Sequence, residues 1–136
     1  MSKRILIVDD EATSRKLIHK LLEAYGDCEF AMDGMEAIRK VHQSLEDNNP
    51  YALITLDILM PHVLGSKALR IIRNMEKQKE LKNPAKIIFI TNLKKDKIDI
   101  DLINPQFEAY LGKPLVAAKL FAILDELKIQ QTALEY

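Results

Sequence analysis

Short apolar runs alternate with segments of helical periodicity along most of the chain. Residues 5–8 form the first apolar run, and apolar positions at three- and four-residue spacing then predict a helix over roughly residues 12–25. Further strands are expected at residues 28–31, 51–56, 86–91 and 108–111. The later helical stripes are Ala37, Ile38, Val41 and Leu45, then Ala68, Leu69, Ile72 and Met75, and finally Leu120, Phe121, Leu124 and Leu127.

The weakest part of this pattern is the stretch from Asn92 to Phe107. Its apolar residues Ile98, Ile100, Leu102 and Ile103 do not lie on one helical face, and Asn104-Pro105 interrupts them. A short or distorted fourth helix is therefore expected there. Five strand–helix units predict an α/β protein with a doubly wound, five-stranded parallel sheet.

Two of the predicted strands end in aspartate. Residues 5–8 are followed by Asp9-Asp10, and residues 51–56 are followed by Asp57. The ends of buried parallel strands meet at one edge of a sheet, where open α/β sheets bind their ligands. Three carboxylates held together repel one another unless a cation or protons intervene, and their hard oxygen donors suit Mg²⁺. The pattern therefore indicates a metal-assisted phosphate chemistry.

Composition narrows the alternatives. The 136 residues suit one domain, expected to span residues 1–136 with a core at about 3–128 and a short tail at 129–136, and 48% apolar residues can form its core. With 20 basic and 20 acidic residues, no net charge favours nucleic acid or an anionic membrane. Cys28 is the only cysteine, which excludes an internal disulfide, and no long apolar stretch or signal peptide is present. A cytoplasmic protein is expected.

The residues at the strand ends resemble those of a known family. Asp9-Asp10-Glu11, Asp57-Ile58-Leu59-Met60-Pro61, Thr91 and Lys113-Pro114 follow successive strands in the order found in response-regulator receiver domains. The likeness covers the whole chain and is closest to stand-alone receivers of the chemotaxis CheY type. It implies the flavodoxin-like (βα)5 fold with strand order 2-1-3-4-5.

The resemblance also implies roles in phosphoryl transfer. Asp57 would be the phosphoacceptor, attacking the phosphorus of a phosphohistidine to form an acyl phosphate. Mg²⁺ would be held by Asp9, Asp10, Asp57 and the backbone carbonyl of Leu59. Thr91 and Lys113 would stabilise the charge of the phosphoryl group by a hydrogen bond and an ion pair.

Further implications concern signalling. Tyr110 would be the aromatic switch residue, and a cis peptide bond before Pro114 would aim Lys113 into the site. The phosphodonor would be a sensor histidine kinase or a phosphotransfer protein, and an unknown downstream protein would read the switched surface. Such a domain would catalyse only its own phosphorylation and dephosphorylation. It would be a monomer or weak dimer that contacts neither DNA nor membrane.

Three departures from the family pattern leave a second possibility open. The usual Asp-Gly after Met-Pro is here Leu64-Gly65, in which Gly65 would keep a flexible entry to the third helix. Asn92 is larger than the residue expected after Thr91, and Gln106-Phe107 replaces the usual Gly-Ala. The alternative is a degenerate receiver, a protein-interaction module that works without phosphorylation. An independent phosphatase or kinase is disfavoured, since residue 59 is leucine and no phosphate-binding loop is present.

Overall fold

The structure is a computed structural model that describes residues 3–94 and 107–132. Strands and helices alternate in the order β1 (Arg4–Val8), α1 (Ala12–Leu22), β2 (Asp27–Ala31), α2 (Gly34–Glu46), β3 (Leu53–Leu56), α3 (Gly65–Gln78), β4 (Lys86–Thr91), β5 (Ala109–Gly112) and α5 (Ala117–Glu126). The fourth helix expected between Asn92 and Phe107 falls almost entirely outside the described residues, as does Gln106.

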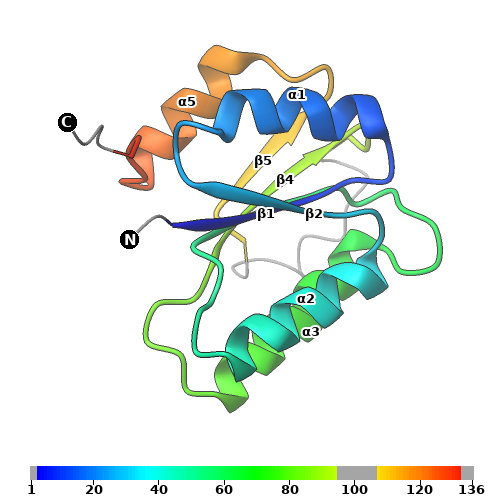
Figure 1. Ribbon diagram of the computed structural model, residues 1–136. Helices are drawn as coiled ribbons and strands as arrows, with labels where there is room; N and C mark the ends of the chain where they lie inside the picture. Colours follow the sequence, from blue (N-terminus) through cyan, green and yellow to red (C-terminus); the bar gives the residue numbers. More distant parts are fainter. Residues whose placement is uncertain (1–2, 95–106, 133–136) are drawn as a thin grey trace.

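The five strands form one parallel sheet with the order β2-β1-β3-β4-β5, which confirms the predicted fold class and strand order. Helices α1 and α5 cover one face and α2 and α3 cover the other, so the fold has three layers (Figure 1). After β2 the chain crosses to the opposite side of β1 to form β3. The order of the strands therefore reverses between β1 and β3, where open α/β sheets bind ligands.

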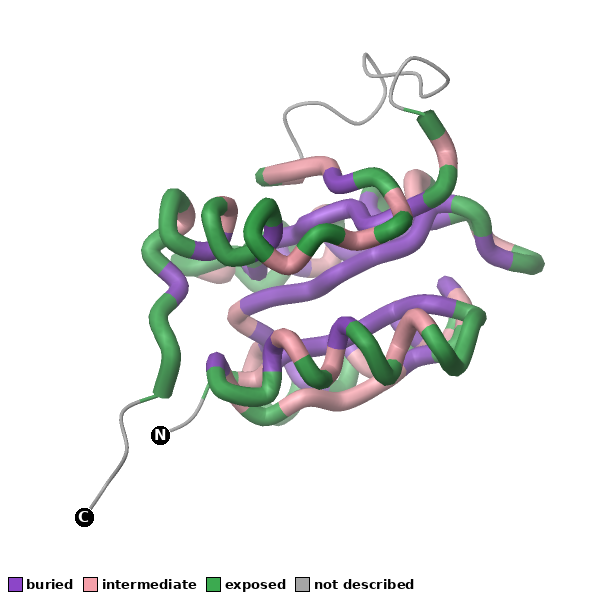
Figure 2. Tube along the Cα trace, turned by 90° about the horizontal axis from the view of Figure 1, so that it is seen from above, coloured by how far each residue is buried: buried purple, intermediate pink, exposed green. Residues whose placement is uncertain are grey.

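Burial on both faces explains the uninterrupted apolar runs in the sequence. The sheet is buried along most of its length while the outer sides of the helices are exposed (Figure 2). A strand covered on both sides needs apolar residues at every position, not only at alternate ones. In the part of the chain that the structure describes, no helix has the length and apolar character needed to cross a membrane.

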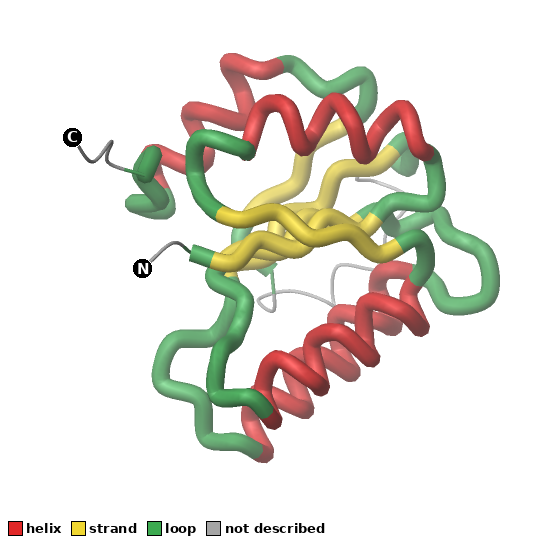
Figure 3. Tube along the Cα trace, viewed as in Figure 1, coloured by secondary structure: helices red, strands yellow, loops and turns green. Residues whose placement is uncertain are grey.

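Several element boundaries differ from the expectation. Helix α1 ends at Leu22 instead of continuing to Tyr25, and a turn leads into β2 (Figure 3). Tyr25 is nevertheless buried and stacks on Phe121, so its apolar periodicity reflects tertiary packing outside the helix. Strand β5 begins at Ala109, one residue later than expected. The residue before it, Glu108, still bonds to β4, because its backbone N–H donates to the Ile87 carbonyl at 2.9 Å and its carboxylate accepts the Ile87 N–H at 2.6 Å.

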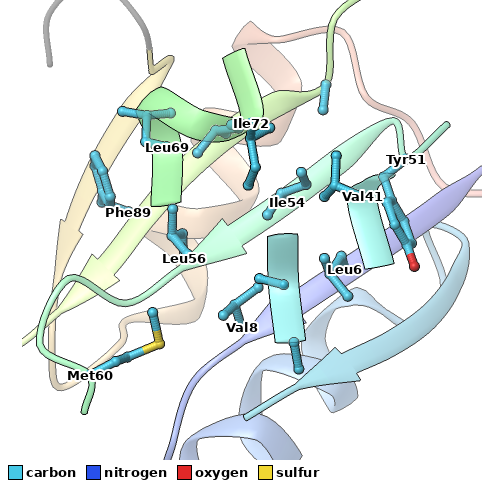
Figure 4. Packing of buried hydrophobic residues seen from close by; sticks show 14 of the residues in the cluster. Leu6, Val8, Val41, Tyr51, Ile54, Leu56, Met60, Leu69, Ile72 and Phe89 are labelled. Atoms are coloured by element: carbon cyan, nitrogen blue, oxygen red, sulfur yellow. The ribbon is translucent and has the colours of Figure 1, made fainter. Parts of the chain in front are cut away.

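Alternate strand residues build two separate cores. Leu6, Val8, Ile54 and Leu56 point toward α2 and α3, as Figure 4 shows. Ile5, Ile7 and Leu53 pack instead with residues of α1 and α5. Each fully buried Leu or Ile contributes roughly 1.5–3 kcal/mol relative to an exposed one, so both cores hold the strand ends in place.

Helix α2 begins at an aspartate–glycine pair, Asp33-Gly34. Asp33 caps the helix, because its carboxylate accepts the Glu36 N–H at 2.8 Å, and Gly34 is the first helical residue. A Cβ atom at Gly34 would lie 2.9 Å from Val63 Cβ. The missing side chain lets the loop between β3 and α3 pack closely on α2, beside the end of β3.

Candidate functional site

Three aspartates from adjacent strands meet at the carboxyl end of the sheet, on the right-hand side of Figure 1. Asp9 and Asp10 follow β1, and Asp57 follows β3. Each carboxylate offers one oxygen, and these three oxygens lie within 4.8 Å of one another. Asp9 is 0% exposed and Asp57 is 4% exposed, whereas Asp10 faces solvent. The structure therefore brings together the three carboxylates that the sequence placed at two strand ends.

Backbone hydrogen bonds fix the orientation of the two buried carboxylates. The Glu11 N–H donates to Asp9 Oδ1 at 2.9 Å, and the Leu59 N–H donates to Asp57 Oδ1 at 3.1 Å. A guanidinium N–H of Arg15 donates to the Asp9 carbonyl oxygen at 2.8 Å, which ties α1 to the end of β1. In both carboxylates the second oxygen is directed to another partner.

That partner is the ammonium group of Lys113. Its Nζ lies 2.8 Å from Asp9 Oδ2, 3.2 Å from Asp57 Oδ2 and 3.5 Å from Glu11 Oε1. The lysine is carried by the end of β5, where its backbone N–H donates to the Thr91 carbonyl at 2.8 Å and the peptide bond to Pro114 is cis. A buried cluster of like charges is thus paired with one cation from a distant part of the chain.

Burial and ion pairing shift the pKa values of both Asp9 and Lys113. Loss of hydration raises the pKa of Asp9 above its ordinary value of 3.8, although Lys113 and the Glu11 N–H act in the opposite direction. Burial alone would lower the pKa of Lys113, but the carboxylates of Asp9 and Asp57 outweigh it and raise that pKa. Lys113 is therefore charged at neutral pH, while an ionised Asp9 carries a desolvation cost that its neighbours offset only in part.

The donor set fits a hard divalent cation. Three carboxylate oxygens are hard donors, and the exposure of Asp10 gives the cluster access to the waters that Mg²⁺ keeps when proteins bind it. A cation at this position would neutralise the repulsion that Lys113 now offsets. The Leu59 carbonyl, the fourth expected ligand, belongs to the loop directly after Asp57.

The remaining residues singled out in the sequence lie on β4, on β5 and in the segments next to these strands and to α3. Thr91 is fully buried at the end of β4, and its hydroxyl oxygen accepts the Leu93 N–H at 3.3 Å. Tyr110 is half-buried in β5 and packs against the core below α2 and α3. Asn92 is exposed in the wall of a groove of about 350 Å³, which Lys113 also lines. Leu64 is exposed at the start of α3.

The expected reason for glycine at position 65, a flexible entry to the third helix, differs from the steric reason that the structure shows. A Cβ atom there would lie 2.2 Å from the Asp57 carbonyl oxygen and 2.8 Å from Ile58 Cα, and its backbone has no positive φ. The glycine permits close contact between α3 and the end of β3 rather than a flexible entry to the helix. Its spacing of eight residues after Asp57 is the only sequence signal, and spacing does not reveal a contact distance.

Two other residues at the site received no role from sequence reasoning. Arg15 holds the Asp9 backbone, and Glu11 approaches Lys113. The position of Arg15, six residues after Asp9 in the first helix, is a weak signal because exposed helix faces often carry arginine. The contact of Glu11 with Lys113 could be recognised only once the position of the Lys113 ammonium was known.

The chain is similar to a known protein family and to several of its members. The family model of the response regulator receiver domain matches residues 5–125. The osmosensing histidine protein kinase SLN1 of Saccharomyces cerevisiae is 29% identical over 92% of this chain, which spans only 10% of that kinase. The chemotaxis protein CheY of Bacillus subtilis is 30% identical over 93% of this chain and 98% of its own length. The receiver domain of the histidine kinase CKI1 from Arabidopsis thaliana, solved with Mg²⁺ and BeF3⁻, has a TM-score of 0.80 at 27% identity, covering 94% of this chain and 91% of that one.

Because Gly65 lies so close to the end of β3, a methyl group added at this position should destabilise the fold. Gly65→Ala should lower the free energy of unfolding by about 2 kcal/mol, because the clash is with backbone atoms that cannot move aside. The control is Gly112→Ala, where a Cβ atom meets nothing within 4 Å and should change stability little. Urea unfolding of both variants measures the difference, and equal stabilities would refute the steric account.

Burial of the ionised Asp9 carboxylate costs free energy, so replacing it with the neutral amide of asparagine should stabilise the protein. The folded protein binds the Asp9 proton more tightly than the unfolded chain does, so the contribution of Asp9 to stability falls as pH rises from 3.8 through its raised pKa. At pH 7 in EDTA, Asp9→Asn should be more stable than the wild type by about 1 kcal/mol, a few degrees in melting temperature. The gain should vanish below pH 3.8. Asp10→Asn, at the exposed aspartate, is the control, and a lower melting temperature for Asp9→Asn would contradict the account.

Proposed function

The chain belongs to the response regulator receiver domain family, and on this basis we propose that it is a phosphoacceptor switch of a two-component or phosphorelay system. Asp57 is the phosphoacceptor. The observation that carries the proposal is the position of its carboxylate, which lies beside two further aspartates and within 3.2 Å of the Lys113 ammonium. Receiver domains act as signalling modules, so the consequence of phosphorylation is a change in protein contacts.

The proposed reaction needs little covalent chemistry from the protein. A carboxylate oxygen of Asp57 attacks phosphorus, the bond from phosphorus to the donor nitrogen breaks, and an acyl phosphate forms. The proposed donor is the phosphohistidine of a sensor histidine kinase or a phosphotransfer protein. The hydrogen bond that the Leu59 N–H donates to Asp57 Oδ1 supports the role of Asp57 as nucleophile. It fixes the orientation of the carboxylate, while Oδ2 faces the Lys113 ammonium.

The proposed cofactor is Mg²⁺, held by Asp9, Asp10, Asp57 and the Leu59 carbonyl. When bound, the cation supplies charge neutralisation between Asp57 and the phosphoryl oxygens. The donor set supports this assignment, since one oxygen from each of the three carboxylates lies within 4.8 Å of the other two. Asp9 and Asp10 carry the negative charge that makes the site selective for a divalent cation.

Lys113 and Thr91 are the proposed electrostatic partners of the phosphoryl group. Lys113 now contacts both buried aspartates, so it needs only to exchange a carboxylate oxygen for a phosphoryl oxygen. Thr91 ends the neighbouring strand, and its hydroxyl has a proton to donate because its present bond to Leu93 uses only its oxygen as acceptor. Tyr110 lies in β5, three residues before Lys113. It is the proposed switch residue, which transmits the effect of phosphorylation to a docking surface.

Intact-mass analysis with small phosphodonors tests the proposal. In the presence of Mg²⁺ and phosphoramidate or acetyl phosphate, the wild type should gain one phosphoryl adduct. Asp57→Asn should gain none, because the nucleophile is lost, and EDTA should abolish the wild-type adduct. Asp125→Asn, an exposed carboxylate in α5, is the matched control and should be phosphorylated normally.

Two results would contradict the proposal. An adduct of undiminished yield in Asp57→Asn would place the phosphoryl group elsewhere. No adduct from either donor would favour the alternative of an interaction module that works without phosphorylation.

A further inference from the structure

Glu11 is an exposed carboxylate at the rim of the proposed phosphorylation site. Its side chain is 59% exposed, and its Oε1 lies 3.5 Å from Lys113 Nζ. Glu11 is the residue before α1, but its side chain makes no capping hydrogen bond to the helix. Its carboxylate is thus neither a hydrogen-bonding cap of the helix nor a member of the three-aspartate cluster, and its side chain pairs with Lys113.

Lys113 has three carboxylate partners with different relations to the proposed chemistry. Asp9 and Asp57 are buried and belong to the proposed metal site, whereas Glu11 lies outside it. A phosphoryl group arriving at Asp57 needs the Lys113 ammonium as its own ion-pair partner. Glu11 competes for that ammonium, and the competition is strongest once a divalent cation satisfies the two aspartates.

The charge of Glu11 also acts directly on an arriving phosphodonor. Lys113 Nζ is 3.5 Å from the Glu11 carboxylate and 3.2 Å from the Asp57 carboxylate, so Glu11 lies inside the Debye length of about 8 Å from the reacting oxygen. Glu11 lines the same groove as Asn92 and Lys113, which opens beside the site. Its negative charge repels a dianion more than a monoanion.

We propose that Glu11 is a specificity-determining residue that slows phosphorylation of Asp57 by free dianionic acyl phosphates. The proposal rests on the proposed function, with Asp57 as the phosphoacceptor. A phosphohistidine presented by a protein gains binding energy from contacts remote from phosphorus, so it overcomes a penalty that a free small donor cannot. Glu11 thus favours transfer from a docked partner over transfer from small metabolite-like donors.

The two test donors differ in charge but react at the same atom. With acetyl phosphate, a dianion at pH 7, Asp57 forms the new oxygen–phosphorus bond while the bond to the acetyl oxygen breaks and acetate leaves with the electron pair. With phosphoramidate, a zwitterionic monoanion at the same pH, the phosphorus–nitrogen bond breaks and ammonia leaves with the electron pair, because its third proton is already on nitrogen. The ratio of the two initial rates therefore reports the effect of donor charge at one site.

The test compares Glu11→Gln with the wild type at saturating Mg²⁺ and low ionic strength, with initial rates measured by intact mass. The acetyl phosphate rate should rise about two- to fivefold, the range of a solvent-exposed ion pair, and the phosphoramidate rate should rise less. The difference should shrink in high salt. Glu23→Gln makes the same charge change after the far end of α1 and should leave both rates unchanged.

The outcomes separate this inference from the function on which it rests. A higher acetyl phosphate to phosphoramidate ratio in Glu11→Gln, but not in Glu23→Gln, supports it. An unchanged ratio overturns it, even if the wild type is phosphorylated on Asp57, and in that case the proposed function stands. Absence of an adduct in the wild type with both donors overturns both proposals.

Discussion

The repulsion among three carboxylates at one edge of the sheet is the constraint on which the site depends. Asp9 and Asp57 are buried, so water screens their charges poorly, and burial raises the pKa of Asp9. Lys113, brought from the end of β5, contacts both and offsets part of the repulsion. The same excess of negative charge that costs stability creates affinity for a second cation, and we infer that the cost is retained for function.

The fold is the means by which these charges are brought together. Strand order β2-β1-β3-β4-β5 makes β1 and β3 neighbours, with Val8 paired to Leu56, so the residues that follow both strands emerge side by side. Strand β5 is two strands away from β3, and the long side chain of Lys113 spans that distance. Helices on both faces hold the strands rigidly, while the close contact at Gly65 presses α3 against the backbone of Asp57, the proposed phosphoacceptor.

Much of this arrangement could be predicted from the sequence, because it follows from local patterns. Uninterrupted apolar runs ending in aspartate predicted the strands, the sheet and the carboxylate cluster, and the resemblance to a known family predicted the position of Lys113. The sequence did not reveal that Tyr25 packs beyond the end of α1 or why residue 65 is glycine. Those features, and the approach of Glu11 to Lys113, depend on contacts between segments far apart in the chain.

We infer that a cation must balance the carboxylate cluster and that Lys113 provides part of that charge. Calorimetric titration of Mg²⁺ into the wild type and Lys113→Met tests it most directly, because it requires neither a phosphodonor nor a partner. One Mg²⁺ site is expected in the wild type, and Lys113→Met should bind Mg²⁺ at least about threefold more tightly, because a competing cation has been removed. Equal or weaker binding in Lys113→Met, with the fold intact by circular dichroism, would contradict it.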